Sequence, residues 1–437
     1  MPRPTIAALS SGRLPSAVAV VRVSGPQAFR AGEALCGRLP EARVAGLRRL
    51  VRGADRAVLD EALVLTFPGP ASATGEDLLE LQCHGSPAVV EAVLAELALH
   101  GVRLAEPGEF TRRAFEAGRL DLTQVEGLAD LLSAATEAQR AQAAAQAGGA
   151  LRRAAERWRD ALIGLMAGVE AEIDFADEAD TAGSALDRDA AERLIGELGA
   201  ALAGFSAGER VREGVRCAIV GPVNAGKSAL LNALAGRDAA IVSDRAGTTR
   251  DVIEVQAVFG GVPVTLMDTA GLRESADPIE AEGIARARLR AAEAEIVLAV
   301  SAEADWADAP NGAIRVWSKS DLRGGLGNQP VSDAADGSGL LHISVQTGVG
   351  LDALRSTITA AARAVAGHGE PQLVTRGRQR DAVVRARDGV VAALREPDPA
   401  LQGEALRQAS VALDRLAGRS DVEDVLGAIF SRFCIGK

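Results

Sequence analysis

The sequence contains few aromatic residues, few cysteines and almost no lysine. Only 3% of its 437 residues are aromatic and none is tyrosine, so its cores have to be built from Ala, Leu, Val and Ile. Such cores favour helices that pack closely on small side chains. The four cysteines, at positions 36, 83, 217 and 434, have no CxxC spacing. They therefore indicate neither a zinc site nor a disulfide framework.

Long hydrophobic runs are also missing. No stretch of 18 or more residues is continuously apolar, so no membrane span is expected. The first residues lack the apolar core of a signal peptide, which predicts a cytoplasmic protein. The net charge of −11 does not suit bulk nonspecific binding of nucleic acid, although a local basic patch stays open. An apolar content of 48% excludes disorder along the whole chain, and the length suggests about three domains.

Lysine is confined to three positions, although the chain has 48 basic residues. These are Lys227, Lys319 and Lys437, and the other basic residues are arginines. Two of the three lie inside short motifs that follow apolar runs, 221–228 and 318–321. A chain that uses arginine nearly everywhere is expected to keep lysine where a compact ammonium group is needed.

The pattern of apolar residues and turn residues changes twice along the chain. Residues 1 to about 115 mix short apolar runs with turn residues, which predicts a compact α+β domain with strands at 18–23, 61–67 and 77–83 and a helix at 87–100. Long helices are predicted from a capping box at Thr123–Glu126 to about residue 210, and again after about residue 366, with a second box at Ser420–Glu423. The acidic run 170–180 is interpreted as a solvated helix end or loop. The stretch 215–366 alternates strands and helices, so we expect an α/β domain inserted into a helical one.

Residues 221–228, Gly-Pro-Val-Asn-Ala-Gly-Lys-Ser, match the phosphate-loop pattern G-x4-G-K-[ST]. The loop follows a predicted strand at 216–220 and precedes a predicted helix at 229–235. In this context backbone N–H groups wrap the phosphates at a helix N-terminus. Lys227 is expected to reach the β- and γ-phosphates, and Ser228 to bind Mg²⁺.

Further motifs follow in the order of a GTPase. The polar loop 243–251 offers a hydroxyl to Mg²⁺, Asp268 can hold Mg²⁺ through water, and Gly271 can donate to the γ-phosphate. Asp321 can accept N1–H and N2–H of guanine, a contact that adenine does not offer. The predicted GTP-binding residues are Asn224, Ala225, Gly226, Lys227, Ser228, Ala229, Ser243, Asp244, Arg245, Ala246, Gly247, Thr248, Thr249, Asp268, Thr269, Ala270, Gly271, Ser318, Lys319, Ser320, Asp321, Ser344, Val345 and Gln346, with Ser228 and Thr249 on Mg²⁺.

Two positions depart from the usual GTPase pattern. Ser318 stands where the guanine motif commonly has Asn, and it cannot make the same amide contacts. Leu272 stands where Ras-like proteins place the glutamine that orients the attacking water. The group that positions water must therefore come from another residue, and Arg273, Glu274, Glu280 and Glu282 are nearby candidates.

The motifs resemble the tRNA-modification GTPases of the MnmE/TrmE type along essentially the whole chain. They include Thr5–Ala8, Arg22–Gly25, Thr74–Asp77, Glu80–Gln82, His84–Gly85, Pro107–Phe115, Leu120–Leu122, Asn224–Ser228, Ala246–Asp251 and the tail Phe433–Lys437. The resemblance implies a multidomain α/β plus all-α fold. Its parts would be an N-terminal α+β folate-binding and dimerisation domain (1–118), a discontinuous helical domain (119–212 and 367–437) and an inserted P-loop, Ras-like G domain (213–366).

The resemblance also implies an activity. A GTP-hydrolysing homodimer would form a heterotetramer with a FAD-containing partner and modify C5 of wobble uridine 34 in certain tRNAs. It would add an aminomethyl-type (carboxymethylaminomethyl) group with a one-carbon unit from 5-formyl-tetrahydrofolate or a related tetrahydrofolate. By position, the folate site would contain Arg22, Glu80, Arg119 and Lys437, a K⁺ site Asn224, Ser243, Arg245 and Thr248, and Glu280 would be the catalytic acid that positions water.

Two other functions are compatible with parts of the sequence. One is a GTPase switch in ribosome assembly or RNA binding, but no basic RNA-binding appendage follows the G domain. The other is a stand-alone one-carbon transferase with a degenerate G domain, and the intact Lys227, Ser228, Asp268 and Asp321 argue against it.

Overall fold

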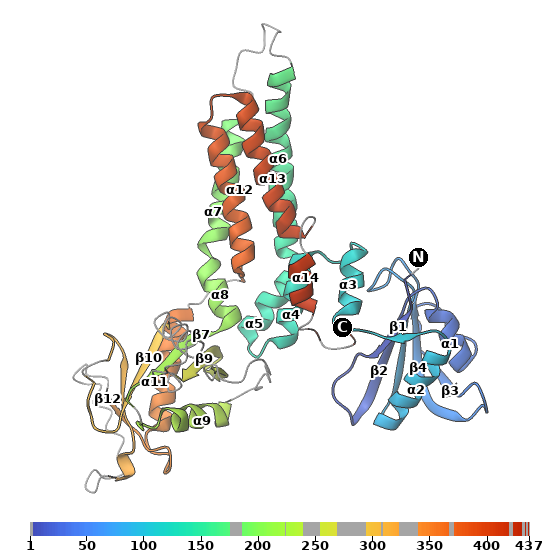
Figure 1. Cartoon of the computed structure of the whole chain (residues 1–437), viewed down its shortest axis with the longest axis horizontal. Helices are drawn as coiled ribbons and strands as arrows, with labels where there is room; N and C mark the ends of the chain where they lie inside the picture. Colours follow the sequence, from blue (N-terminus) through green and yellow to red (C-terminus); the bar gives the residue numbers. More distant parts are fainter. Residues whose placement is uncertain are drawn as a thin grey trace, which may run out of the picture. The chain divides into compact units, whose positions relative to one another are not determined.

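The computed structural model describes residues 3–174, 186–222, 224–238, 254–268, 294–306, 309–322, 340–366, 371–418, 423–430, 433 and 436. The chain divides into two compact units, each of which is discontinuous in sequence. The first contains Met1–Ala129, Gln146–Leu186 and Ala392–Lys437, and the second contains Asp130–Ala145 and Asp187–Val391. Figure 1 shows the helices and strands of the chain, coloured from the N-terminus to the C-terminus.

The first unit begins with a six-stranded sheet in the order β3-β4-β5-β2-β1-β6. Its strands are β1 (Ile6–Leu9), β2 (Ser16–Ser24), β3 (Gly46–Val51), β4 (Val58–Phe67), β5 (Leu78–Gly85) and β6 (Arg103–Leu104). Helices α1 (Ala28–Cys36) and α2 (Pro87–Leu99) pack on one face of the sheet, where the alternate residues Val21, Val23, Leu79 and Leu81 are buried. The opposite face therefore presents the other set of side chains, including Arg22 and Glu80.

The helix α3 (Glu109–Glu116) packs on that opposite face through Phe110, which is buried with Ile6 and Ala8 of β1. It is followed by α4 (Leu122–Ser133) and the long α6 (Ala150–Asp174). From the other end of the chain come α13 (Pro399–Ala417) and α14 (Glu423–Phe430). Helices α6 and α13 pack against each other, and Arg159 of α6 pairs with Asp414 of α13 at 3.4 Å. Helical segments from both flanks of the α/β insertion thus come together, as the sequence predicts.

The capping box at the start of α4 lies two residues earlier than predicted. The Asp121 carboxylate accepts the N–H of Gln124 at 2.8 Å, and the Gln124 side-chain oxygen accepts the N–H of Asp121 at 3.2 Å. The predicted box at Thr123–Glu126 is wrong, because Thr123 is already inside the helix and its hydroxyl donates to Asp121. Asp121 and Gln124 form the same reciprocal pair of hydrogen bonds as Ser/Thr and Glu in a capping box. The second predicted box falls mostly on 419–422, outside the described residues.

The second unit holds a six-stranded sheet in the order β12-β11-β10-β7-β9-β8. Its strands are β7 (Val215–Val220), β8 (Glu254–Phe259), β9 (Val262–Asp268), β10 (Ile296–Ser301), β11 (Ile314–Trp317) and β12 (Leu340–His342). All neighbouring pairs are parallel except β8 with β9, and α9 (Lys227–Asp238) and α11 (Leu351–Ala366) bury their apolar residues against the sheet. The remaining helices are α5 (Glu137–Ala147), α7 (Arg188–Ala203), α8 (Phe205–Glu213) and α12 (Gly377–Arg395).

The observed elements confirm the predicted fold class: an N-terminal α+β part, long helices and an α/β insertion. The predicted strands 18–23 and 61–67 lie within β2 and β4, the predicted strand 77–83 begins one residue before β5, and the predicted helix 87–100 ends one residue after α2. Strands β1, β3 and β6 were not predicted. Strands β1 and β6 have only four and two residues, too few to show an alternating pattern. Among the described helices, none is both long and apolar enough to cross a membrane.

Candidate functional site

The predicted nucleotide motifs meet at one edge of the second sheet. The phosphate loop follows β7, Asp268 ends β9, Ser318 follows β11 and Ser344 comes two residues after β12. These four strands run parallel within the sheet, so their carboxyl ends share an edge. This edge is where doubly wound sheets bind ligands. Motifs that are far apart in the sequence are therefore neighbours at one edge of the sheet.

The first glycine of the phosphate loop allows the loop to approach the neighbouring strand closely, because it has no side chain. Gly221 has φ +146°, and a Cβ built on it would lie 2.0 Å from the carbonyl oxygen of Val300 in β10. Lys227 begins α9, and its ammonium donates to the carbonyl oxygens of Gly221 and Pro222, each at 2.7 Å. Burial lowers the pKa of Lys227, and the carboxylate of Asp268 opposes this effect. The Lys227 ammonium group therefore lies against the backbone of the phosphate loop.

The two predicted Mg²⁺ groups of this region also meet. The Ser228 hydroxyl donates to the Asp268 carboxylate at 2.6 Å, although the two residues are 40 positions apart. A hydroxyl and a carboxylate oxygen are the hard ligands that Mg²⁺ prefers. The Ser228–Asp268 contact therefore brings two oxygen ligands of this type together beside the phosphate loop.

On the base side of the edge, Asp321 lies in a short 3₁₀ turn (Ser320–Leu322) and is exposed. Lys319 has a left-handed backbone (φ +56°). Ser344 is fully buried, and its backbone N–H donates to Val349 at 3.0 Å, while Val345 is half-buried and Gln346 is exposed. The backbone N–H of Ser344 is therefore engaged within its own turn, which leaves Val345 and Gln346 as the residues of this segment nearer to solvent.

Some predicted residues are described only in part or not at all. Asn224 is exposed with φ +63°, Ala225 is buried and Ala229 lies exposed in the first turn of α9. The other predicted nucleotide, K⁺ and catalytic residues lie outside the described residues: Ser243, Asp244, Arg245, Ala246, Gly247, Thr248, Thr249, Thr269, Ala270, Gly271 and Glu280. The same holds for Leu272, Arg273, Glu274 and Glu282, and for Lys437.

The predicted folate residues Arg22 and Glu80 stand directly opposite each other on β2 and β5. The Arg22 guanidinium donates twice to one Glu80 oxygen, at 2.8 and 3.0 Å, and its carbon lies 5.9 Å from the centre of the Phe110 ring. The side chains are 26% and 17% exposed, so this pair is accessible from solvent. The charges that interrupt these two strands are therefore partners of each other on the face that α1 and α2 leave uncovered.

Arg119 and the tail each contact a segment that adjoins a strand of the first sheet. Arg119 is exposed, and its side chain lies beside Gly75 in the 72–77 loop. The carbonyl oxygen of Gly436 accepts the Ser10 hydroxyl at 2.8 Å, and a Cβ on Gly436 (φ +100°) would lie 2.1 Å from the carbonyl oxygen of Leu9. Gly436, the residue before Lys437, therefore packs at the end of β1, although it lies more than 400 positions from that strand in the sequence.

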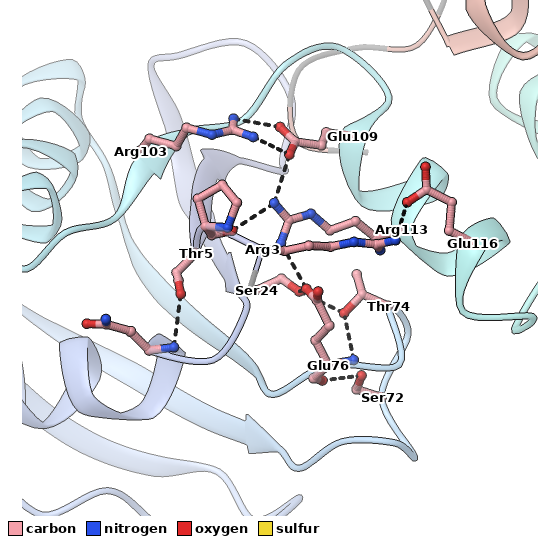
Figure 2. A network of polar contacts seen from close by, with 12 residues as sticks. Arg3, Thr5, Ser24, Ser72, Thr74, Glu76, Arg103, Glu109, Arg113 and Glu116 are labelled. Carbon is pink, nitrogen blue, oxygen red and sulfur yellow. Dashed lines mark hydrogen bonds and ion pairs between the residues drawn. The ribbon is translucent and has the colours of Figure 1, made fainter. Parts of the chain in front are cut away.

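An ion-pair network that was not predicted from the sequence joins α3 to this sheet (Figure 2). Arg113, with a side chain only 4% exposed, donates to Glu76 at 2.9 Å, to Glu109 at 2.8 Å and to the Pro4 carbonyl at 2.9 Å. The Ser24 hydroxyl also donates to Glu76, at 3.0 Å. These contacts tie α3 to β2 and to the 72–77 loop. The available signal was that the motif 107–115 places Glu109 and Arg113 one helical turn apart.

Glu109 is the most strongly perturbed acid of this network. Burial by itself raises its pKa, but hydrogen bonds from Arg103, from the backbone N–H of Glu106 and from Arg113 outweigh burial and hold the pKa at about 2. Burial raises the pKa of Cys83 and of Cys217 to about 12, so neither is a reactive thiol near neutral pH. The tail cysteine Cys434 lies outside the described residues.

Comparison with known proteins identifies the family. A model described as "MnmE helical domain" matches residues 122–434, and one described as "GTP-binding protein TrmE N-terminus" matches residues 5–119. A tRNA modification GTPase MnmE of Rhodopseudomonas palustris (strain BisB5) is 50% identical, with 99% of each chain covered. The chain belongs to the MnmE family of tRNA modification GTPases.

A second MnmE relative, from Azorhizobium caulinodans, is 52% identical with 99% of each chain covered. A crystal structure of an Aquifex aeolicus Era variant bound to GDP.AlF4⁻ is 26% identical over 42% of this chain and 69% of that one, with a TM-score of only 0.27. Membership of the MnmE family confirms the predicted GTPase activity and the P-loop G domain.

Proposed function

We propose that the chain is the GTP-hydrolysing component of a tRNA modification enzyme. With a FAD-dependent partner it adds a carboxymethylaminomethyl-type group at C5 of wobble uridine 34, using a tetrahydrofolate one-carbon unit. The observation that carries the proposal is the meeting of the phosphate loop, Asp268, Ser318–Asp321 and Ser344 at one sheet edge, in a chain of the MnmE family. Each motif alone is short, and their common location supports a single nucleotide site.

In this site the backbone N–H groups of Asn224–Ala229 cradle the phosphates at the N-terminus of α9. Lys227 leaves its two carbonyl partners and binds the β- and γ-phosphates, because a phosphate is a stronger acceptor for an ammonium than a neutral carbonyl. Ser228 and Asp268 suit Mg²⁺ by their oxygen chemistry and their 2.6 Å contact, and Thr249 completes the proposed set. The metal supplies charge neutralisation on the phosphates.

Hydrolysis needs a group that replaces the missing glutamine at Leu272. We assign this role to Glu280, which positions the attacking water. Asn224, Ser243, Arg245 and Thr248 are the proposed K⁺ residues. Asn224 fits this role among the described ones, because it is an exposed amide side chain within the phosphate loop. The cation offsets negative charge that develops during phosphoryl transfer.

The one-carbon chemistry is assigned to the first unit. Arg22, Glu80, Arg119 and Lys437 are the proposed folate residues. The solvent-accessible Arg22–Glu80 pair offers a cation and a carboxylate side by side, which suits a ligand that has both acid groups and a ring with N–H donors. Docking of Gly436 at the end of β1 is consistent with a role of the neighbouring Lys437 on the same sheet.

The assembly follows from the same proposal. The protein acts in the cytoplasm as a homodimer, forms a heterotetramer with the FAD-containing partner and binds tRNA. The functional division remains 1–118, 119–212, 213–366 and 367–437. The two compact units cut across the helical part of this division, since α4, α5 and α12 each pass from one unit to the other.

Nucleoside analysis of tRNA tests the proposal. A strain that lacks this chain should lose the modified wobble uridine, and a plasmid copy should restore it. A plasmid copy with Lys227→Ala is the matched control, because it removes the phosphate-binding ammonium and should fail to restore the modification. Unchanged wobble nucleosides in the deletion strain would contradict the proposed reaction.

A further inference from the structure

The residue that replaces asparagine in the guanine motif, Ser318, is fixed in place by its backbone. Its N–H donates to the carbonyl oxygen of Ser301 at the end of β10, at 2.9 Å. Two residues on, the N–H of Ser320 donates to Ile343, which follows β12, at 3.1 Å. The loop after β11 is therefore anchored to segments at the ends of both neighbouring strands, and the direction of the Ser318 side chain is well defined.

The Ser318 hydroxyl is buried and already has a partner. The residue is 4% exposed, and its hydroxyl donates at 2.6 Å to the carbonyl oxygen of Ala225, a phosphate-loop residue that is 1% exposed. A serine hydroxyl has a single proton to donate. Because that proton is used on a buried carbonyl, the hydroxyl can offer only lone pairs to any further group.

The use of this proton on Ala225 limits how Ser318 can bind a guanine base. Guanine presents N7 and O6 as acceptors, so it is bound at that edge only by donors. An asparagine side chain has two amide protons and can satisfy a protein carbonyl and a base acceptor together. The Ser318 hydroxyl can donate to only one of these two acceptors. If it donated to the base, the buried Ala225 carbonyl would lose its hydrogen-bond partner, which is costly.

We infer that Ser318 is a positioning residue that braces the phosphate loop against the base loop and gives no hydrogen bond to guanine N7. The inference rests on the proposed function, which places GTP at this edge. Base discrimination then depends on Asp321, whose carboxylate reads the opposite, N–H-bearing edge of guanine. In this chain the first residue of the motif braces the phosphate loop but no longer donates to the base.

The test compares GDP with 7-deaza-GDP, which lacks the N7 acceptor, by calorimetric titration of the full-length chain. The wild-type chain should bind both within about twofold, and this measurement needs no variant. Ser318→Ala should weaken both nucleotides by the same factor, on the order of tenfold, because the Ala225 carbonyl loses a buried partner. Ser318→Thr keeps a hydroxyl and should bind both nearly as the wild type does.

Ser356→Ala is the matched control. Its hydroxyl also donates to a backbone carbonyl, that of Asp352 at 3.0 Å, but on the exposed face of α11, so its loss should change neither affinity. A wild-type preference for GDP over 7-deaza-GDP that disappears in Ser318→Ala would overturn the inference, as would wild-type affinity for GDP in Ser318→Ala. Failure of the wild-type chain to prefer GDP over ADP would contradict the guanine site itself and so counts against the proposed function.

Discussion

Replacing Arg113 by methionine should loosen α3 from the N-terminal sheet. The change removes a guanidinium that is 4% exposed and leaves Glu76 and Glu109, which are 21% and 12% exposed, without their shared cation. Breaking a buried ion pair by removing one partner costs about 3 to 5 kcal/mol. Because both carboxylates keep other hydrogen-bond donors, Ser24 for Glu76 and Arg103 for Glu109, we expect the lower value, about 3 kcal/mol.

Hydrogen exchange read by mass spectrometry is the suitable assay, because a chain with two compact units has no single free energy of unfolding. A loss of about 3 kcal/mol predicts amide exchange about a hundredfold faster in α3 and the 72–77 loop. Arg112→Met is the matched control. Arg112 is 51% exposed and pairs only with Glu116 one turn along, so it should cost about 0.5 kcal/mol or less. Equal exchange in the two variants would refute the argument for a buried network.

The nucleotide site, the C-terminal tail and the ion-pair network support further predictions. Asp321→Asn should shift nucleotide preference from GTP toward xanthosine triphosphate, because the amide offers a donor where the carboxylate accepts. GTP turnover should be faster in K⁺ than in Na⁺, and Glu280→Ala should slow it by a factor on the order of 10² to 10⁴ with little loss of GTP affinity. Deletion of Ile435–Lys437 should abolish tRNA modification while GTP binding is largely kept. Glu109, with a folded pKa of about 2 against 4.5 for the free group, should stabilise the folded state above about pH 4.5, and this stabilisation is lost as the pH falls toward 2.

Each of these has a result that would count against it. Continued preference of Asp321→Asn for GTP would show that the base is read elsewhere. Equal turnover in KCl and NaCl would remove the cation from the mechanism, and a fully active Glu280→Ala would remove the acid. Wild-type nucleoside levels after the tail deletion would exclude the tail from the folate site. The protection of α3 amides against hydrogen exchange, after correction for the slower intrinsic exchange in acid, should fall toward pH 2 in the wild type but not in Glu109→Gln. Persistence of that fall in Glu109→Gln would assign the acid sensitivity to another group.

The nucleotide site was predictable from sequence because its parts are local. A phosphate loop is a strand, a glycine-rich turn and a helix start in direct succession, and the order of the later motifs identifies a GTPase. The structure confirmed the strand before the loop and the helix after it, with the bounds moved by two residues or fewer at the loop side. Parallel strands then bring the motifs to one edge without further information from the residues between them.

Long-range pairing is what only the tertiary structure decided. Arg22 and Glu80 each interrupt an apolar strand, and the sequence allowed both a binding role and an outward charge. Only the register of β2 against β5 made them partners. The bond from Ser318 to Ala225 spans 93 positions and that from Ser10 to Gly436 spans 426. Hydrophobic periodicity and turn residues report on neighbours along the chain, whereas these contacts depend on which strands pair and how helices cover them, and this is set by packing of the whole unit.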